Sequence, residues 1–168
     1  MANNYTQTSF EFDCGSPENV TKIACWINGD ATHPYPDALR DMMVGLCEEI
    51  FDGDDLAFTI ADADRVEGEP HKVWLRFDES GDIEMTALIL GFAMLTMSEV
   101  PDRQGFTWAE TCSRPRIGEF GGGACLICRS GVKWMHTSEW LEEAIRADRL
   151  SCGIAAAQEM LDGEAARP

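Results

Sequence analysis

An apolar stretch at residues 83–97 constrains the fold of this chain more than any other segment. Apolar side chains cover most of the circumference of a helix built from it, so such a helix has to be buried on nearly all sides. The stretch is shorter than the ~20 residues that a membrane-spanning helix needs. We therefore expect a core helix that starts after Gly81 and packs across a sheet.

Two helices precede this core helix in the sequence. Ser16 followed by Pro17 is typical of a helix start, because serine caps the first turn and proline fits the first helical position. After loop-forming residues at 29–36, a second helix follows that we expect to end at Gly53. Its apolar residues recur at helical spacing and are expected to point inward: Leu39, Met43, Leu46 and Ile50.

Alternating apolar and polar residues predict the strands. They lie at residues 9–13, 56–61, 72–77, 106–112, 124–128 and 132–135. A charged loop at 62–70 is expected to join the second and third strands, and Ser130 and Gly131 are expected to form a tight turn between the last two. We expect a further helix from Thr137 or Ser138 to about residue 147, and a weaker one at 151–161.

This order of elements predicts a single α+β domain over residues 1–168, with a mostly antiparallel sheet packed by three to five helices. A length of 168 residues with 45% hydrophobic residues is enough for one core. We expect residues 162–168 to be frayed. The domain divides into an acidic helical N-terminal half (1–69), a strand-rich core (70–150) and a C-terminal helix and tail (151–168).

The cysteines indicate a reducing compartment. There are seven, an odd number at irregular spacing, which is not the framework of a disulfide-rich secreted domain. The first residues also lack the basic and apolar regions of a signal peptide. We therefore expect a cytoplasmic protein.

Negative charge is concentrated in the N-terminal part of the chain. Of the net charge of −17, residues 11–69 carry −12, because they hold 15 Asp and Glu against three basic residues. Such a field repels nucleic acid and membrane headgroups and attracts basic surfaces over about a Debye length, ~8 Å at physiological salt. We expect a basic partner, no direct nucleic-acid binding and no membrane. The candidate partner-binding residues are Asp37, Asp41, Glu48, Glu49, Asp52, Asp54, Asp55, Asp62, Asp64, Glu67 and Glu69.

The spacing of acids on the second helix indicates how such a surface could work. On its outward side Asp37 and Asp41, and again Glu48 and Asp52, lie ~6 Å apart along the helix axis, close to the spacing of successive phosphates in a nucleic-acid strand. This acidic stripe is consistent with mimicry of a nucleic-acid backbone. It is also consistent with an ordinary solvated helix face on an acidic protein. Both interpretations stay open.

Cys125 and Cys128, with Cys112 upstream and His136 downstream, are residue types that bind zinc. The two residues between Cys125 and Cys128 indicate a buried strand, in which positions 125 and 128 point to opposite faces. Small buried core cysteines are therefore the default interpretation. We expect no metal and no cofactor.

A catalytic pocket is the alternative that the sequence offers for the same region. A nucleophile such as Cys112 would need a base such as His136 and an orienting carboxylate such as Glu119. With Arg114 and Arg116 these residues could form the pocket of a small hydrolase or transferase. Nothing in the spacing demands this pocket, so we expect no catalytic residues and a non-enzymatic protein.

Special residues are dense between residues 107 and 140. The three glycines at 121–123 lack the lysine of a phosphate-binding loop, and we expect a bulge or tight turn there, where another backbone comes close. The run Trp-Ala-Glu-Thr-Cys-Ser-Arg-Pro-Arg-Ile-Gly-Glu-Phe-Gly-Gly-Gly-Ala resembles a motif of small uncharacterised proteins of phages and plasmids. The resemblance covers residues 107–140 and brings no established activity. It implies a mobile-element setting, in which small acidic proteins often block host nucleases or CRISPR complexes.

Together these features favour an inhibitor from a mobile element, for example an anti-CRISPR protein. Its acidic, DNA-mimicking face would occupy a basic nucleic-acid-binding groove of a host protein or ribonucleoprotein complex, such as a CRISPR effector, in the host cytoplasm. The alternative is the small hydrolase or transferase described above. A third interpretation is a structural protein that works as a homodimer with Trp or Met residues at its interface.

Overall fold

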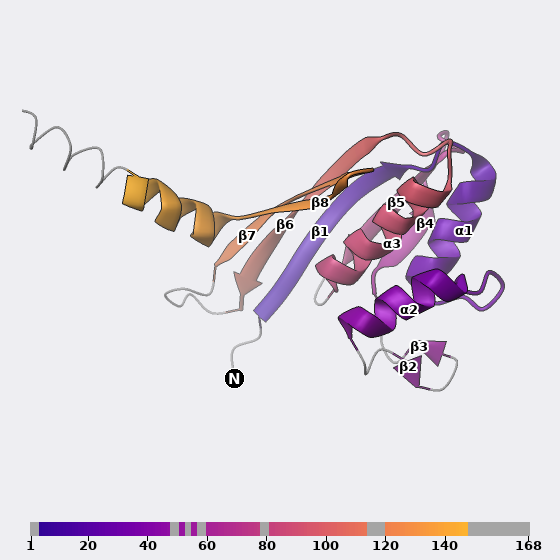
Figure 1. The fold of residues 1–168 in the computed structure, drawn as a ribbon, viewed down its shortest axis with the longest axis horizontal. Coiled ribbons are helices and arrows are strands. Elements are labelled where there is room, and N and C mark those ends of the chain that lie inside the picture. Colours follow the sequence, from indigo (N-terminus) through magenta and orange to yellow (C-terminus); the bar gives the residue numbers. More distant parts are fainter. Residues whose placement is uncertain are drawn as a thin grey trace, which may run out of the picture.

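The fold is built on a six-stranded antiparallel sheet with helices on one of its faces (Figure 1). The computed structural model describes residues 4–47, 51–52, 55–56, 60–77, 81–113 and 120–147. Its elements are β1 (Asn4–Asp13), α1 (Pro17–Asn28), α2 (Asp37–Leu46), β2 (Phe51–Asp52), β3 (Asp55–Leu56), β4 (Asp62–Arg65), β5 (Lys72–Phe77), α3 (Ile83–Thr96), β6 (Arg103–Cys112), β7 (Gly121–Cys128) and β8 (Gly131–His136), and residues 137–147 form a further helix. The strand order β4-β5-β1-β6-β7-β8, antiparallel throughout, confirms the predicted α+β class.

The apolar stretch forms α3, the central helix of the fold. The helix begins where the Asp82 carboxylate accepts a 2.8 Å hydrogen bond from the Met85 backbone N–H. Ile89 and Leu90 are fully buried, and α3 contacts α1, α2 and β7. The prediction of a core helix packed across a sheet is confirmed. No helix in the described part of the chain is long and apolar enough to cross a bilayer.

The start of α1 also matches the prediction. Ser16 Oγ accepts a 3.4 Å hydrogen bond from the Asn19 backbone N–H, and Pro17 is the first helical residue. Ile23 is fully buried between α1 and its neighbours. The helix ends at Gly29, whose φ of 69° lies in the left-handed region that glycine adopts without strain.

Strand alternation gives the sheet a helical face and an open face. In β5 Leu75 points toward the helices and is fully buried, whereas Trp74 and Arg76 point the other way. Phe10 and Phe106 continue the buried side in β1 and β6, with ring centroids 4.6 Å apart. We call the side of the sheet opposite to α1 and α3 the open face.

The second helix ends earlier than predicted. α2 stops at Leu46, and Phe51 and Asp52, expected at the end of a helix reaching Gly53, form the short strand β2 that pairs with β3. Gly45, next to this end, lowers helix propensity by about 1 kcal/mol relative to alanine. Leu39 and Met43 are fully buried as expected, but Leu46 is 46% exposed, so the expectation that it points inward is wrong.

Part of the region predicted as a charged loop is an edge strand. Of the strand expected at 56–61, Leu56 belongs to β3, residues 57–59 lie outside the described residues, and Ile60 and Ala61 lie outside any strand, so the expectation is wrong for these last two residues. In β4 Ala63 faces the helices and is buried, while Asp62 and Asp64 are exposed on the open face. Charged residues alternating with one small residue are typical of a protected edge strand.

The three glycines at 121–123 lie in β7 and form neither the predicted bulge nor the predicted turn. Gly122 pairs with Ala109 and Gly123 with Trp108. A Cβ on Gly122 would lie 2.2 Å from the Trp108 carbonyl oxygen, and one on Gly123 would lie 2.5 Å from the Trp108 ring. The glycines therefore allow the β6 backbone and the Trp108 ring to come close to β7. This confirms the expectation that another backbone approaches these glycines.

β8 is the second edge strand and leads directly into the helix of residues 137–147, which extends away from the rest of the molecule (Figure 1). The turn that joins β7 to β8 consists of Arg129 and Ser130, one residue earlier than the predicted Ser130 and Gly131, because Gly131 already pairs with Cys128 as the first residue of β8. Thr137 Oγ1 donates a 3.0 Å hydrogen bond to the Gly122 carbonyl oxygen and ties the start of this helix to β7. Ile50 and the predicted helix and tail at 151–168 lie outside the described residues.

Candidate functional site

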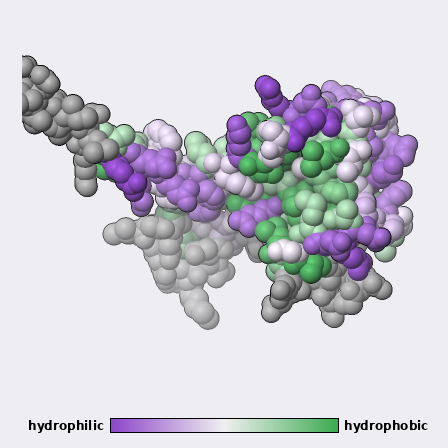
Figure 2. Space-filling model, in the orientation of Figure 1, coloured by the Kyte–Doolittle hydropathy of each residue, from purple (hydrophilic) through white to green (hydrophobic). Residues whose placement is uncertain are grey.

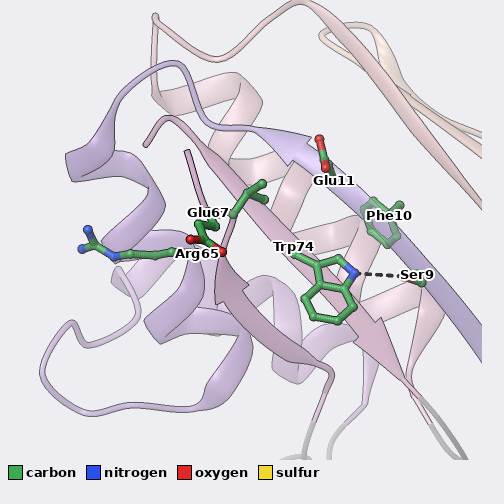
Figure 3. Close-up of a pocket in the computed structure, with 7 residues that line it drawn as sticks. Ser9, Phe10, Glu11, Arg65, Glu67 and Trp74 are labelled. Carbon is green, nitrogen blue, oxygen red and sulfur yellow. Dashed lines mark hydrogen bonds between the residues drawn. The ribbon is translucent and has the colours of Figure 1, made fainter. Parts of the chain in front are cut away.

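The open face carries an exposed tryptophan near the β4 edge. Trp74 of β5 lies between Glu11 of β1 and Asp64 of β4, its partners in the strand register. Its indole Nε1 donates a 2.9 Å hydrogen bond to Ser9 Oγ, and the residue is 40% exposed (Figure 3). Exposed tryptophans are enriched at protein interfaces, because they offer a large apolar area with a polar edge.

A pocket of about 500 Å³ opens beside Trp74. In Figure 3 Glu67 lies to the left of Trp74 and Glu11 lies above it. The pocket therefore combines an aromatic ring with two carboxylates. Its lining residues are Ser9, Phe10, Glu11, Arg65, Val66, Glu67 and Trp74.

The Trp74 ring already holds one cation. The Arg76 guanidinium carbon lies 4.4 Å from the centroid of the Trp74 ring, and Arg76 donates a 2.5 Å hydrogen bond to the Asp64 carboxylate. The Asp62 carboxylate is 3.9 Å from Arg76 Nε. Arg76 does not line the pocket, and Arg65, which does, donates a 2.6 Å hydrogen bond from its guanidinium to Thr21 Oγ1 of α1, away from Trp74 (Figure 3).

Lys72 is the second cation of this surface. Its Nζ lies 3.2 Å from the Glu11 carboxylate and 4.0 Å from that of Glu69. The hydrogen bond to Glu11, together with the charge of Glu69, raises the pKa of Lys72 and keeps it protonated. All three side chains are partly or largely solvent-exposed, so these ion pairs contribute little to stability.

Carboxylates outnumber cations around the pocket, so the local field is negative. We call this surface the acidic sheet end. It consists of Trp74, the carboxylates of Glu11, Asp13, Asp62, Asp64, Glu67 and Glu69, and the cations of Arg65, Lys72 and Arg76.

The predicted acids of α2 lie on a different surface. Asp37 and Asp41 are exposed on α2, which packs on α3 in the helical layer. Beside them α2 exposes Met42, Val44 and Leu46 at 43%, 39% and 46%. Figure 2 shows hydrophobic residues gathered over α3 and beside α2. The outward side of α2 is therefore a mixed surface, and among the described side chains no acid connects Asp37 and Asp41 to the acids of β4.

Five of the predicted partner-binding side chains lie outside what the structure describes. Glu48, Glu49 and Asp54 are not described, and for Asp52 and Asp55 only the backbone of β2 and β3 is described. Of the remaining six, two lie on α2. The other four belong to the acidic sheet end: Asp62, Asp64, Glu67 and Glu69.

The register of β6, β7 and β8 separates Cys112 from His136. His136 is level with Trp108 across two strand spacings, and Cys112 lies four residues further along β6. With strands ~4.8 Å apart and a rise of ~3.4 Å per residue, the two Cα atoms are roughly 17 Å apart. This separation is too large for a nucleophile and its base. The other residues of the alternative pocket lie outside the described residues: Arg114, Arg116 and Glu119.

Cys125 and Cys128 lie on opposite faces of β7, as strand alternation predicts. Cys125 is 3% exposed, and burial raises the pKa of its thiol to about 12. Cys128 lies on the open face, where a hydrogen bond with Ser130 lowers the pKa of its thiol. Among the residues with described side chains, no group of three or more His, Cys, Asp or Glu is arranged to hold a metal ion.

His136 packs among tryptophans on the helical face. Its ring centroid lies 5.2 Å from that of Trp108 and 6.4 Å from that of Trp134. Trp108 Nε1 donates a 3.3 Å hydrogen bond to the Glu110 carboxylate. These contacts give His136 a packing role in this aromatic cluster.

Sequence reasoning missed Trp74 and its pocket. Part of the signal was present, because the alternation of Val73, Leu75 and Phe77 in one strand places Trp74 on the opposite face. The pocket itself depends on β1 and β4 lying on either side of β5. Such long-range pairing is not visible in local periodicity.

Comparison of the chain with known protein families, with characterised proteins and with solved structures finds no match. The function has to be inferred from the side chains that the fold brings together. At the acidic sheet end these are an exposed tryptophan, an open pocket and an excess of carboxylates.

Proposed function

We propose that this protein is a non-enzymatic inhibitor that covers a basic, nucleic-acid-binding groove of a partner protein with its acidic sheet end. The observation that supports this is the pocket beside Trp74, which Glu11 and Glu67 border. An arginine or lysine of the partner would enter this pocket. The indole ring attracts the cation, and the carboxylates form charge-assisted hydrogen bonds with it.

The open face suits contact with a broad groove. β4, β5 and β1 are neighbours in the sheet, so their outward side chains form one surface with rows ~4.8 Å apart. Asp64 of β4 lies beside the exposed Trp74 on one side and Glu11 of β1 lies beside it on the other. An anchor of this kind, within a charged rim, is the usual energetic centre of a protein interface.

The resemblance of residues 107–140 to phage and plasmid proteins extends the proposal to the identity of the partner. In that setting the partner is a host defence complex with a basic groove for nucleic acid, such as a CRISPR effector. The inhibitor would act by occupying the groove, since a surface already covered by carboxylates cannot bind phosphates.

The proposal is tested by capturing partners from host lysate with immobilised protein at two salt concentrations. Three variants are compared with the wild type: Glu11→Lys with Glu67→Lys, Asp37→Lys with Asp41→Lys, and Trp74→Ala. The two double variants change the net charge equally, so they separate the acidic sheet end from the total charge. Circular dichroism verifies that each variant is folded.

We expect the wild type to capture a nucleic-acid-binding protein at low salt and to lose it at high salt. The Glu11 and Glu67 double variant should lose the partner, whereas the Asp37 and Asp41 double variant should keep it. Trp74→Ala should bind the partner about 2- to 30-fold more weakly, because a cation–π contact of roughly 0.5–2 kcal/mol is lost. The purified partner should also lose nucleic-acid binding when wild-type protein is added. Equal binding by both double variants, or capture that ignores salt, would contradict the proposal.

A further inference from the structure

We infer that the free edge of β8 is a homodimer interface. In this dimer a second copy of the chain pairs its own β8 antiparallel with the first, and the helix of residues 137–147 of each copy docks beside a basic cavity of the other. The inference concerns a surface distant from the acidic sheet end and does not depend on the proposed function.

The edge of β8 is open and apolar. β8 pairs with β7 alone among the described strands, so alternate N–H and C=O groups of its other side have no strand partner. Val132, Trp134 and Met135 are 37%, 39% and 47% exposed. A free strand edge with large exposed apolar side chains is a template for pairing with another chain.

The helix that follows β8 is amphipathic and has no cover in the described structure. Trp140, Leu141 and Ile145 form one stripe at helical spacing and are 58%, 53% and 45% exposed. The helix points away from the rest of the molecule (Figure 1). Glu139, Glu142 and Glu143 occupy its other positions and make it acidic.

A basic cavity lies at the opposite end of β8. It has a volume of about 470 Å³ and is lined by Asp102, Arg103, Leu126, Cys128, Arg129, Ser130 and Lys133. Arg129 is paired with Asp102, but no described side chain forms an ion pair with Arg103 or Lys133. Two cations without an ion pair among the described side chains, in a chain with 30 Asp and Glu, indicate a site that an acidic group from another chain can fill.

Strand geometry selects the register of the dimer. A two-fold axis perpendicular to the sheet keeps the two open faces on the same side, so each β8 residue meets a residue of the same face in the second copy. Centring the pair on Lys133 would oppose two like charges, which destabilises a strand pair. Centring it on Trp134 stacks the two Trp134 rings side by side and places Lys133 opposite Met135 of the second copy.

In this register the end of each β8 lies next to the start of the other. When the line of pairing is extended beyond the two strands, position 139 of one copy falls opposite Arg129 of the other. The start of the acidic helix therefore reaches the cavity that Arg103 and Lys133 line. The apolar stripe of the helix can cover Leu126, which lines the cavity and is 41% exposed. Each copy supplies one acidic helix and one basic cavity, so the contact is made twice.

The exposed apolar side chains of β8 and of this helix are numerous enough for a stable dimer. Six large side chains per copy, each about half exposed, remove on the order of 1,000 Å² from water in the two copies together. That is near the lower limit of stable interfaces, before the added strand hydrogen bonds are counted.

The test is a charge swap on the full chain. One variant carries Glu139→Lys and Glu143→Lys, which makes its helix basic, and the other carries Arg103→Glu and Lys133→Glu, which makes its cavity acidic. All four residues are exposed, so both variants should fold, which circular dichroism verifies. Mass is measured by light scattering and sedimentation, first for each protein alone and then for an equimolar mixture.

We expect the wild type to be a dimer at micromolar concentration. Each variant alone should be a monomer, because helix and cavity then carry the same sign of charge. The mixture should form dimers again, since in a mixed pair both contacts join opposite charges. A wild type that stays monomeric up to millimolar concentration overturns the inference and assigns the edge to residues 148–168 or to another protein. A wild-type dimer that both variants preserve places the interface on another surface and also overturns it.

Discussion

The two edges of the sheet solve the same physical problem in opposite ways. Every edge strand has N–H and C=O groups that no strand partner binds. At the β4 edge the Asn28 side chain, at the end of α1, donates to the Ala63 carbonyl oxygen and accepts from the Ala63 N–H, each at 2.9 Å. At the β8 edge no described side chain does this for Val132 or Trp134.

The side chains of the two edges differ in the same sense. β4 places Asp62 and Asp64 outward around the small Ala63, so a second chain would have to bury carboxylates to pair with it. β8 exposes Val132, Trp134 and Met135 on its two faces. The difference indicates that the β4 edge is closed against association, and that the β8 edge is suited to it.

Asn28→Ala is expected to have the largest effect on stability, because it removes the side chain that distinguishes the β4 edge from the β8 edge. It removes two hydrogen bonds to the Ala63 backbone, each worth roughly 0.5–1.5 kcal/mol, so the free energy of unfolding should fall by about 1–3 kcal/mol. Urea unfolding followed by circular dichroism measures the loss. Loss of the amide also reopens the β4 edge, so the variant should associate more readily when it is concentrated.

Asp62→Asn on the neighbouring residue is the matched control. Asp62 is exposed and its contact with Arg76 is long, 3.9 Å, so this change should stay within about 0.5 kcal/mol of the wild type. If Asn28→Ala is no more destabilising than the control, the Asn28 amide does not close the edge and the two edges are not different in this respect.

Much of the fold could be predicted from local patterns. Ser16 and Pro17 predicted the start of α1, and the continuous apolar surface of residues 83–97 predicted α3. The alternation of apolar and polar residues predicted β5, β6 and β8. These patterns are local because helix capping and strand alternation depend on residues at most a few positions apart. The antiparallel α+β class then followed from the order of elements.

The errors lie where long-range contacts override the local pattern. Asp62 and Asp64 suggested a loop, yet Ala63 between them is held by Asn28, 35 residues earlier in the chain. Gly122 and Gly123 suggested a turn, but Trp108 of β6 needs the space that they leave. The candidate site shows the same limit, because Trp74 meets Glu11 and Asp64 only through the strand order of the folded sheet.

A pair of substitutions at Met135 sharpens the comparison from the β8 side. In the register centred on Trp134, residue 135 lies opposite Lys133 of the second copy. Met135→Glu should therefore strengthen the dimer and Met135→Lys should weaken it, since a cross-strand charge pair contributes roughly 0.2–1 kcal/mol and each dimer has two such pairs. Each variant should therefore shift the dimer dissociation constant by about 2- to 30-fold from that of the wild type, in opposite directions, as measured by sedimentation at low salt.

The two Met135 variants also serve as controls for the stability of the monomer. Met135 is 47% exposed, so neither change removes a core contact, and the two monomers should unfold at similar urea concentrations. Equal dissociation constants for Met135→Glu and Met135→Lys would exclude this register, even if the wild type is a dimer.

The smallest expected effect concerns the thiols of β7, one on each face of the strand. Thiolates and not thiols react with iodoacetamide, so the Cys128 thiol, whose pKa is lowered first by its hydrogen bond with Ser130 and then by Lys133 and Arg103, should be alkylated faster near neutral pH than an ordinary cysteine. Cys125, buried and with a pKa of about 12, should remain unmodified in the same reaction, as peptide mass spectrometry measures. Ser130→Ala removes the hydrogen bond and raises the pKa of Cys128, so its pH–rate profile should move to higher pH while the rates converge well above both pKa values.

The Cys128 rate also reports on the β8 edge. Cys128 lines the basic cavity that the helix of a second copy is inferred to cover, so dimerisation should slow its alkylation. Raising the concentration of wild-type protein should lower the alkylation rate of Cys128. The Arg103→Glu and Lys133→Glu variant should lose this dependence on concentration. The loss of two nearby cations in this variant also raises the pKa of Cys128. Because that pKa change acts equally at every concentration, only coverage of the cavity produces a concentration-dependent rate. A Cys128 rate that is independent of concentration while the wild type dimerises would mean that the dimer leaves this cavity open, and the charge difference between the two ends of β8 would then have no role in association.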